Sequence, residues 1–271
     1  MTLTPDEMLE QSQWDFFWAP SDAVVVDRPE VLYVHCPRDV PHLNTVTRVH
    51  CTSERFPALL DEVMQAHRGR RSRWPVLSGR EKLRRELHLA RAGYEPGHEH
   101  YVYAVGPAHY RARPPAAGIT VERVDTIQRL RDCEGVRREA FGEHDAPEEP
   151  EAALERDLEI CVGPAARVAR FVAYDAASSE PVSSGCVTIY SALRFGLFWA
   201  GCTVPAARGR GAYSAIVASR VEFARRAGVR LVGLYARVDT SAQIVARQGF
   251  EPHGGMVHWN RPTGTEADPS T

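Results

Sequence analysis

A glycine-rich turn between a strand-like run and a helical pattern is the segment best suited to chemistry. The apolar run 195–204 leads into the turn 205–213, which contains Gly209 and Gly211, and apolar residues at helical spacing follow. Such a turn exposes backbone amides at the positive end of the helix dipole, where phosphate groups bind. Glycine suits this position because a Cβ would block an approaching anion or strain the backbone. The turn therefore predicts a phosphate or pyrophosphate site.

The spacing of this turn excludes two common phosphate loops. No Gly-Lys-Ser/Thr follows it, as in a Walker loop, and the third glycine and the acidic residue of a dinucleotide fingerprint are missing. The turn instead resembles the acyl-coenzyme A motif of the GNAT superfamily of N-acyltransferases, Arg/Gln-x-x-Gly-x-Gly/Ala. Arg208 and Gly211 match this motif, and a valine and a proline precede it as in the family. Tyr213 departs from the small residue expected last, and the resemblance covers residues 119–260.

The resemblance implies a site for acetyl-CoA as co-substrate. The backbone of 202–204 matches the strand end that pairs with the pantetheine arm, and the amides of 209–214 would hold the pyrophosphate. Arg208 and Arg210 would add positive charge, and Gly201 lies where the family's strand often bulges. The expected cofactor-binding residues are Cys202, Thr203, Val204, Arg208, Gly209, Arg210, Gly211, Ala212, Tyr213 and Ser214.

The implied reaction is transfer of an acyl group, most simply acetyl, from the thioester to an amine by direct attack. It needs a base for the ammonium, an amide near Cys202 for the oxyanion, and an acid for the leaving thiolate. The family's usual tyrosine acid corresponds here to Val245, and 195–204 contains no carboxylate that would act as the base. Tyr235 on the next strand is our candidate acid, and the candidate bases are Glu143, His144 and His258.

Two other functions remain open. The absent tyrosine and strand carboxylate also fit a non-catalytic acyl-CoA-binding sensor or scaffold. Residues 68–85 hold eight basic residues and Trp74, a pattern that nucleic-acid surfaces share. Lys82 is the only lysine among the 33 basic residues of the chain. Arginine density here therefore reflects composition, and we expect no nucleic-acid partner.

An internal repeat suggests that the chain has two related halves. Residues 90–96, ARAGYEP, recur 156 positions later as 246–252, ARQGFEP. Each copy ends a helical pattern at Gly93 or Gly249, and a helix, a strand and a helix precede it in both halves. The first half has no glycine in the matching turn, so we expect a single cofactor site, in the second half. The degenerate first half would then shape the acceptor cleft or a homodimer.

The coarse pattern predicts a mixed α/β chain with the GNAT fold in tandem. The proline pair of the linker 111–118 places the boundary between domains 1–112 and 113–271. The expected elements are helix 57–67, strand 74–77, a helix opened by a capping box at 78–81, strand 99–105, strand 119–124, helices 126–141 and 148–162, strands 171–175, 182–191 and 195–204, helix 211–227, strand 231–238, helix 240–248 with a capping box at Thr240, and strand 255–259.

Composition limits the classes that remain. With 271 residues, 44% of them apolar, and a net charge of −2, the chain reads as an ordinary globular protein. We see no membrane span and no signal peptide, and we expect a cytoplasmic protein. The six cysteines form no C-x-x-C pair, and His98 and His100 lack a third ligand at recognisable spacing, so we expect no metal.

Overall fold

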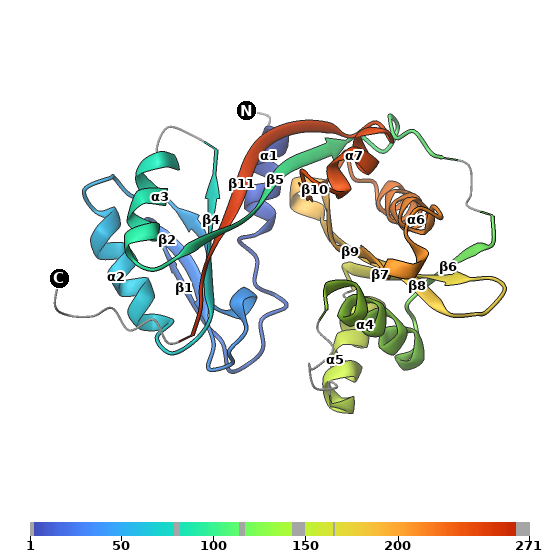
Figure 1. The fold of residues 1–271 in the computed structure, drawn as a ribbon, viewed down its shortest axis with the longest axis horizontal. Helices are drawn as coiled ribbons and strands as arrows, with labels where there is room; N and C mark the ends of the chain where they lie inside the picture. The colour runs from blue at the N-terminus through green and yellow to red at the C-terminus, as the bar shows by residue number, and fades with distance from the viewer. Residues whose placement is uncertain (1–2, 79–81, 114–116, 143–149, 165, 264–271) are drawn as a thin grey trace. The chain divides into compact units, whose positions relative to one another are not determined.

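The computed structural model describes residues 3–78, 82–113, 117–142, 150–164 and 166–263 (Figure 1). The chain forms two compact units, each described here by itself. Unit 1 contains the chain up to Val102 and from His253 onward, and unit 2 runs from Tyr103 to Pro252. The expected division into 1–112 and 113–271 stays a prediction, and the middle of the expected linker, 114–116, lies outside the described residues.

Unit 1 is an α/β unit whose sheet has the order β1-β2-β3-β4-β11-β5. The first three strands are antiparallel, β3 and β4 are parallel, and β11 is antiparallel to β4. Its elements are α1 (Pro5–Ser12), β1 (Val24–Arg28), β2 (Val31–His35), η1 (Pro41–Leu43), β3 (Thr45–Val49), α2 (Phe56–Ala66), β4 (Ser72–Leu77), α3 (Lys82–Arg91), β5 (Glu95–Val105, the last three residues in unit 2) and β11 (Glu251–Arg261, in unit 1 from His253).

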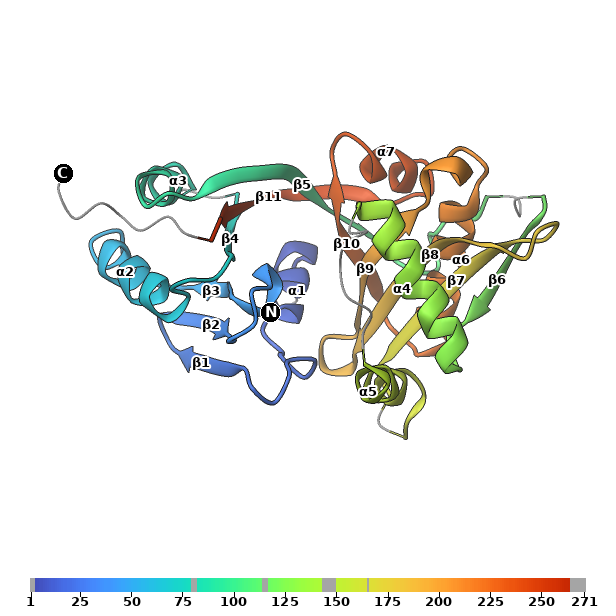
Figure 2. The same cartoon turned by 60° about the horizontal axis from the view of Figure 1, so that its bottom comes forward.

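Unit 2 repeats this arrangement with the order β5-β10-β9-β8-β7-β6. Each of the strands β6 to β9 is antiparallel to the next one along the chain, and β10 is parallel to β9. In Figures 1 and 2, α6 covers one face of this sheet and α4 with α5 covers the other. Its elements are β6 (Ile119–Arg123), α4 (Ile127–Phe141), α5 (Glu151–Val162), β7 (Val168–Asp175), β8 (Pro181–Tyr190), η2 (Ser191–Leu193), β9 (Phe195–Thr203), η3 (Pro205–Ala207), α6 (Ala212–Arg226), β10 (Leu231–Arg237) and α7 (Ser241–Ala246).

The tandem repeat predicted from the short sequence match is visible in both units. In each, three antiparallel strands lead through a helix to a parallel strand, and a second helix then ends at a left-handed glycine. Gly93 has φ +79° and Gly249 has φ +89°. The amide of Tyr94 donates to the carbonyl of Leu89, and that of Phe250 to that of Val245. These are matching C-terminal caps, because only glycine adopts this conformation without a Cβ clash.

Threonine side chains cap the starts of α1 and α4. Thr126 begins α4, since its side chain accepts a hydrogen bond from the amide of Arg129. The capping box predicted at Thr240 is wrong: its side chain makes no cap, and the Ser241 hydroxyl instead accepts from the amide of Arg237. The box predicted at 78–81 lies partly outside the described residues. Among the described residues, no helix is long and apolar enough to span a membrane.

Candidate functional site

The glycine turn before α6 has the backbone that the sequence predicted. Gly209 has φ +80° and Gly211 has φ +84°, and Gly211 is the residue that begins α6. A Cβ at Gly209 would meet no atom within 4 Å, so the space beside this residue is open. No side chain caps the helix here. The first amides of an α-helix have no intrahelical acceptor, so those of α6 can receive an anion.

Tyr213, which departs from the family motif, does not narrow this turn. Its ring lies next to Gly201 of β9: a Cβ added at Gly201 would be 2.9 Å from Tyr213 Cε2. The ring also lies 5.8 Å from the guanidinium carbon of the buried Arg220. The side chain of Tyr213 therefore packs against Gly201 of β9 and Arg220 of α6, away from the space beside Gly209.

Strands β9 and β10 separate beside the turn. Their parallel register covers Phe195 to Leu197 on β9 and Leu231 to Gly233 on β10. Among the described residues, β9 from Phe198 to Thr203 does not pair with β10. Parallel strands normally satisfy each other's amides and carbonyls along their length. The separation thus leaves one edge of β9 available to another extended chain.

A bulge in β9 sets which backbone groups face that edge. The register with β8 shifts between Ser184 and Cys186, and Ala200 has φ +48°. The bulge expected at Gly201 is therefore present at Ala200 and its neighbour. The amide of Val204 donates to Val182 of β8, 3.0 Å away, so Thr203, one residue earlier, directs its amide and carbonyl to the opposite edge.

Cys202 is part of the sheet rather than a reactive group. Its carbonyl accepts the Ser183 hydroxyl at 2.6 Å, and its side chain is buried next to Ser184. Burial raises the pKa of the Cys202 thiol. A thiol that resists ionisation is a poor nucleophile. The oxyanion donor expected from a backbone amide near Cys202 stays a prediction.

The two arginines of the turn have different surroundings. Arg208 is exposed, and its Nε donates to the carbonyl of Thr203 at 3.4 Å. Arg210 forms a close ion pair with Asp175 at the end of β7, and this pairing holds the pKa of Asp175 below its usual value. The charge of Arg210 is thus partly neutralised within unit 2, while Arg208 lies beside the open edge of β9.

Arg220 is a charged residue on the buried face of α6. It is 1% exposed, its guanidinium lies 4.6 Å from the centre of the Phe198 ring, and Nη1 donates to the carbonyl of Cys186 at 3.4 Å. Its Nε and Nη2 have no hydrogen-bond partner among the described residues. A Cβ at Gly185 would lie 3.1 Å from its guanidinium carbon, and one at Gly201 3.3 Å from Nη2. Both glycines therefore make room for Arg220 beneath the bulge.

A second buried polar group lies at the end of α7. Tyr110 packs edge-on against Phe250, 6.3 Å between ring centres, and the amide of the next residue, Arg111, donates to Gln248 at 2.9 Å. Burial raises the pKa of Tyr110 to about 12, which the charge of Arg220 partly opposes. Its hydroxyl has no partner among the described residues. Nothing in the local sequence around Tyr110 indicates this placement, which comes from tertiary packing.

The candidate catalytic side chains are not brought together. Val245, at the family's tyrosine position, is a core residue with no exposed surface. Tyr235 lies half-buried on β10 beyond the paired part of that strand, so its role stays a prediction. Glu143 and His144 lie outside the described residues. His258 belongs to unit 1, where burial, with smaller effects from Arg73 and His100, holds its pKa well below the usual value.

Two further predictions from the sequence concern a metal ion and a nucleic-acid partner. No group of three or more His, Cys, Asp or Glu side chains within the described ranges is arranged to hold a metal ion. Within the basic stretch 68–85, Arg71 pairs with Asp39, and Lys82 pairs with Glu86. These cations are thus partly neutralised by neighbouring carboxylates.

Solved structures share this fold. A GCN5-related N-acetyltransferase from Kribbella flavida matches with a TM-score of 0.67 at 18% identity over 99% of both chains. A tandem GNAT protein from the clavulanic acid biosynthesis pathway matches with a TM-score of 0.60 at 14% identity over 95% of this chain and 88% of its own. A GCN5-related N-acetyltransferase from Sphaerobacter thermophilus matches with a TM-score of 0.58 at 20% identity, covering 88% of this chain and 75% of its own.

These matches confirm the predicted fold. The chain has the mixed α/β fold of GNAT N-acetyltransferases, in two copies. No family model matches the sequence, and no curated protein matches it.

Proposed function

We propose that this chain is an N-acyltransferase that transfers an acyl group, most simply acetyl, from acetyl-CoA to an amine acceptor. The observation that carries the proposal is the unpaired edge of β9 beside a glycine turn whose helix lacks a side-chain cap. The unpaired edge of β9 suits an extended pantetheine-like chain, and the glycine turn suits a diphosphate. Their adjacency on one strand and the following turn favours a single ligand that has both parts.

The residues that would hold the coenzyme follow from this geometry. The backbone of Cys202, Thr203 and Val204 lies along the splayed strand, and Thr203 faces its open edge. Gly209, Arg210, Gly211, Ala212, Tyr213 and Ser214 would direct amides to the diphosphate, and Arg208 would add charge from the rim. The positive φ of Gly209 and Gly211 fits this assignment, because a cradle of consecutive amides needs such a backbone.

The chain's own groups would contribute differently to the chemistry. The bound coenzyme would supply an acyl thioester, which is an activated carbonyl with a thiolate leaving group. The amide of Thr203 would donate to the oxygen of that carbonyl as negative charge develops, and one such donor is worth about 2.7–4 kcal/mol in other acyl-transfer enzymes. Tyr235 would donate a proton to the leaving sulfur.

Calorimetry tests the binding part of the proposal. We expect acetyl-CoA to bind with a stoichiometry of one per chain, because the matching turn of unit 1 lacks glycine. A stoichiometry of two would contradict the single-site part, and no binding at all would contradict the whole assignment.

A non-catalytic acyl-CoA sensor or scaffold is the second candidate. The buried Val245 in place of a tyrosine and the absence of a carboxylate from the β9 sequence favour it. Release of free thiol from acetyl-CoA in the presence of an amine panel separates the two functions. A transferase releases thiol only when an acceptor is present, whereas a sensor binds acetyl-CoA without turnover.

A further inference from the structure

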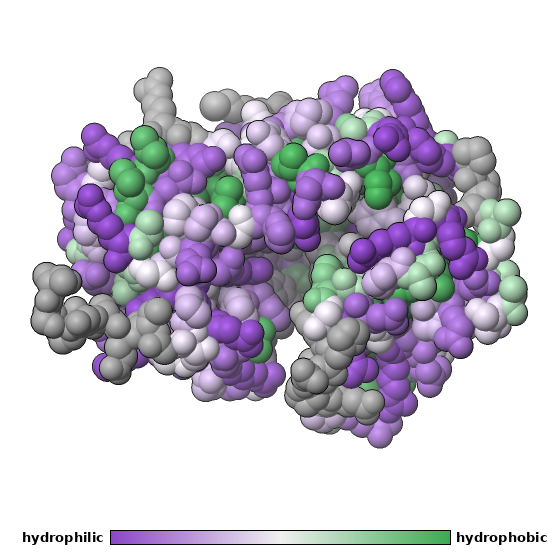
Figure 3. Space-filling model, in the orientation of Figure 1, coloured by the Kyte–Doolittle hydropathy of each residue, from purple (hydrophilic) through white to green (hydrophobic). Residues whose placement is uncertain are grey.

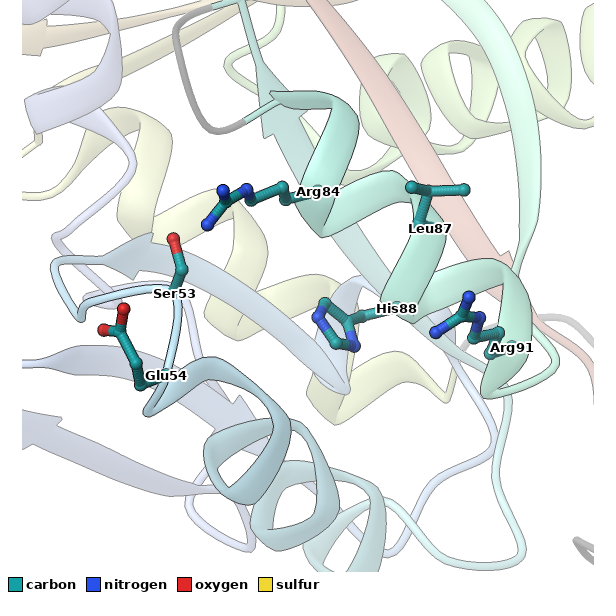
Figure 4. Close-up of a pocket in the computed structure, with 6 residues that line it drawn as sticks. All are labelled: Ser53, Glu54, Arg84, Leu87, His88 and Arg91. Atoms are coloured by element: carbon teal, nitrogen blue, oxygen red, sulfur yellow. The ribbon is translucent and has the colours of Figure 1, made fainter.

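Unit 1 contains an open pocket of about 320 Å³ between the turn before α2 and one face of α3 (Figure 4). Figure 4 shows Arg84, His88 and Arg91 projecting from α3 toward the turn that carries Ser53 and Glu54. The volume is at the lower end of the range for small-molecule sites, about 300–1,000 Å³. The lining residues are Ser53, Glu54, Arg84, Leu87, His88 and Arg91.

The repeat places this pocket at the counterpart of the glycine turn. Helix α2 begins at Phe56 and α6 at Ala212, which are 156 residues apart, as are the matching helix ends at Gly93 and Gly249. The turn with Ser53 and Glu54 in unit 1 therefore corresponds to the turn with Gly209 in unit 2. Helix α3 likewise corresponds to α7.

The backbone of this turn has lost the features that would hold a diphosphate. Arg55, which precedes α2, has an ordinary helical conformation with φ −85°. The amide of Phe56 already donates to the carbonyl of Thr52 at 3.1 Å, and Pro57 has no amide hydrogen. Backbone amides in the first turn of α2 therefore offer little to an anion.

Side chains supply positive charge in place of those amides. Arg84, His88 and Arg91 are four and three residues apart, so they share one face of α3. No ion pair of Arg84 or Arg91 is found in the described parts of the chain, whereas Lys82 of the same helix pairs with Glu86. Glu54 is the opposing charge: hydrogen bonds from its own amide and from Thr52, and then the charge of Arg84, hold its pKa below the usual value.

The pocket also has an apolar component. Leu87 is 51% exposed on its wall, and Leu83, one turn earlier on α3, is 68% exposed. In Figure 3, apolar side chains gather on the surface at the position of α3 in unit 1. An inorganic ion would use only the arginines and leave this surface exposed to water.

We propose that this pocket binds a small organic molecule that carries a phosphate group. Guanidinium groups bind phosphate through two parallel hydrogen bonds, and two arginines at the ends of one helix face suit such a group. Leu87 would contact the organic part of the molecule. The phosphate would belong to a free phosphorylated metabolite rather than to a second coenzyme, because the turn before α2 lacks the glycine backbone of the coenzyme site.

Titration of the full chain carrying Gly211→Val with inorganic pyrophosphate at low salt tests the charge of the pocket, because that substitution removes the competing diphosphate site proposed in unit 2. In this background Glu54→Gln removes the opposing charge, so we expect pyrophosphate to bind about fivefold more tightly than without it. An Arg84→Ala/Arg91→Ala variant should bind about tenfold more weakly, because each arginine donates charged hydrogen bonds. The control is Arg71→Ala, which removes an exposed arginine outside the pocket.

The Glu54→Gln result decides the proposal, because a gain of affinity does not come from misfolding. Unchanged or weaker binding in this variant would overturn it, and so would equal losses in the Arg71 control and the double variant. Coenzyme A calorimetry then tests whether the ligand is a free metabolite. A second equivalent per chain that disappears in the double variant would contradict that source, and a single equivalent that remains in that variant supports it.

Discussion

Gly211 and Gly228 provide a matched pair that separates stability from cofactor binding. They lie at the two ends of α6 with φ +84° and +71°, so alanine strains the backbone at both. An L residue in the left-handed region costs about 1–2 kcal/mol. We expect Gly211→Ala and Gly228→Ala to lower the free energy of unfolding, measured in urea, by about that amount each.

The two variants should differ in affinity for acetyl-CoA. A Cβ at residue 211 would also crowd the bound diphosphate, and a cost of about 1–2 kcal/mol for that crowding is roughly a five- to thirtyfold weaker affinity. Gly228 lies at the far end of the helix with no atom within 4 Å of an added Cβ, so its variant should bind normally. Gly211→Val, which is β-branched, should abolish binding.

Calorimetry with acetyl-CoA gives the deciding comparison. Equal destabilisation of both variants with no change of affinity at Gly211 would refute the assignment of the turn as the diphosphate cradle. A loss of affinity in both variants would show that strain anywhere in α6 is sufficient.

Four further predictions concern single side chains. Tyr235→Phe should lower thiol release about a hundredfold or more without changing affinity for acetyl-CoA. Equal turnover in Tyr235→Phe and the unchanged protein would remove Tyr235 as the acid. Tyr110→Phe should leave the free energy of unfolding in urea almost unchanged, because the Tyr110 hydroxyl is unpartnered within the described chain. Arg220→Ala should lower the free energy of unfolding in urea by about 2–4 kcal/mol. Arg220→Met should lower it less, because methionine keeps the packing and removes a buried charge. A larger loss in Arg220→Met than in Arg220→Ala would contradict this account. Burial, which outweighs the hydrogen bond to Val34, lowers the pKa of His67 to about 4. Between pH 6.5 and pH 4 the unfolded chain therefore binds more protons than the folded chain, and the free energy of unfolding should fall by up to about 3 kcal/mol as the pH is lowered across that range. A His67→Gln variant with the same dependence of stability on pH would contradict this prediction.

Much of the site was predictable because it depends on residues close in sequence. The positive φ of Gly209 and Gly211 follows from a strand, a tight turn and a helix within twenty residues. The bulge near Gly201 and the glycine-ended helices of the repeat are equally local. In contrast, the capping box predicted at Thr240 is absent because Thr240 has φ −137° and ψ −85°, outside the extended backbone that a capping residue adopts. The residue pattern does not contain this backbone direction.

The positions of charged side chains needed the folded chain. Arg210 and Asp175 are 35 residues apart and meet only because β7 ends beside the turn. Arg220 sits on an apolar helix face, and its burial beneath the bulge depends on the space left by Gly185 and Gly201. His258 follows the second repeat in sequence, but pairing of β11 with β4 makes it part of unit 1.

The amino-acid sequence by itself determined the order of helices and strands, the doubled architecture and the backbone of the glycine turn, because these arise from periodicity and from conformations that glycine alone adopts readily. Only the tertiary structure decided how far β9 and β10 stay paired and which arginines are neutralised by carboxylates. Those outcomes depend on distances between segments far apart in the chain, and such distances are set by packing of the whole core.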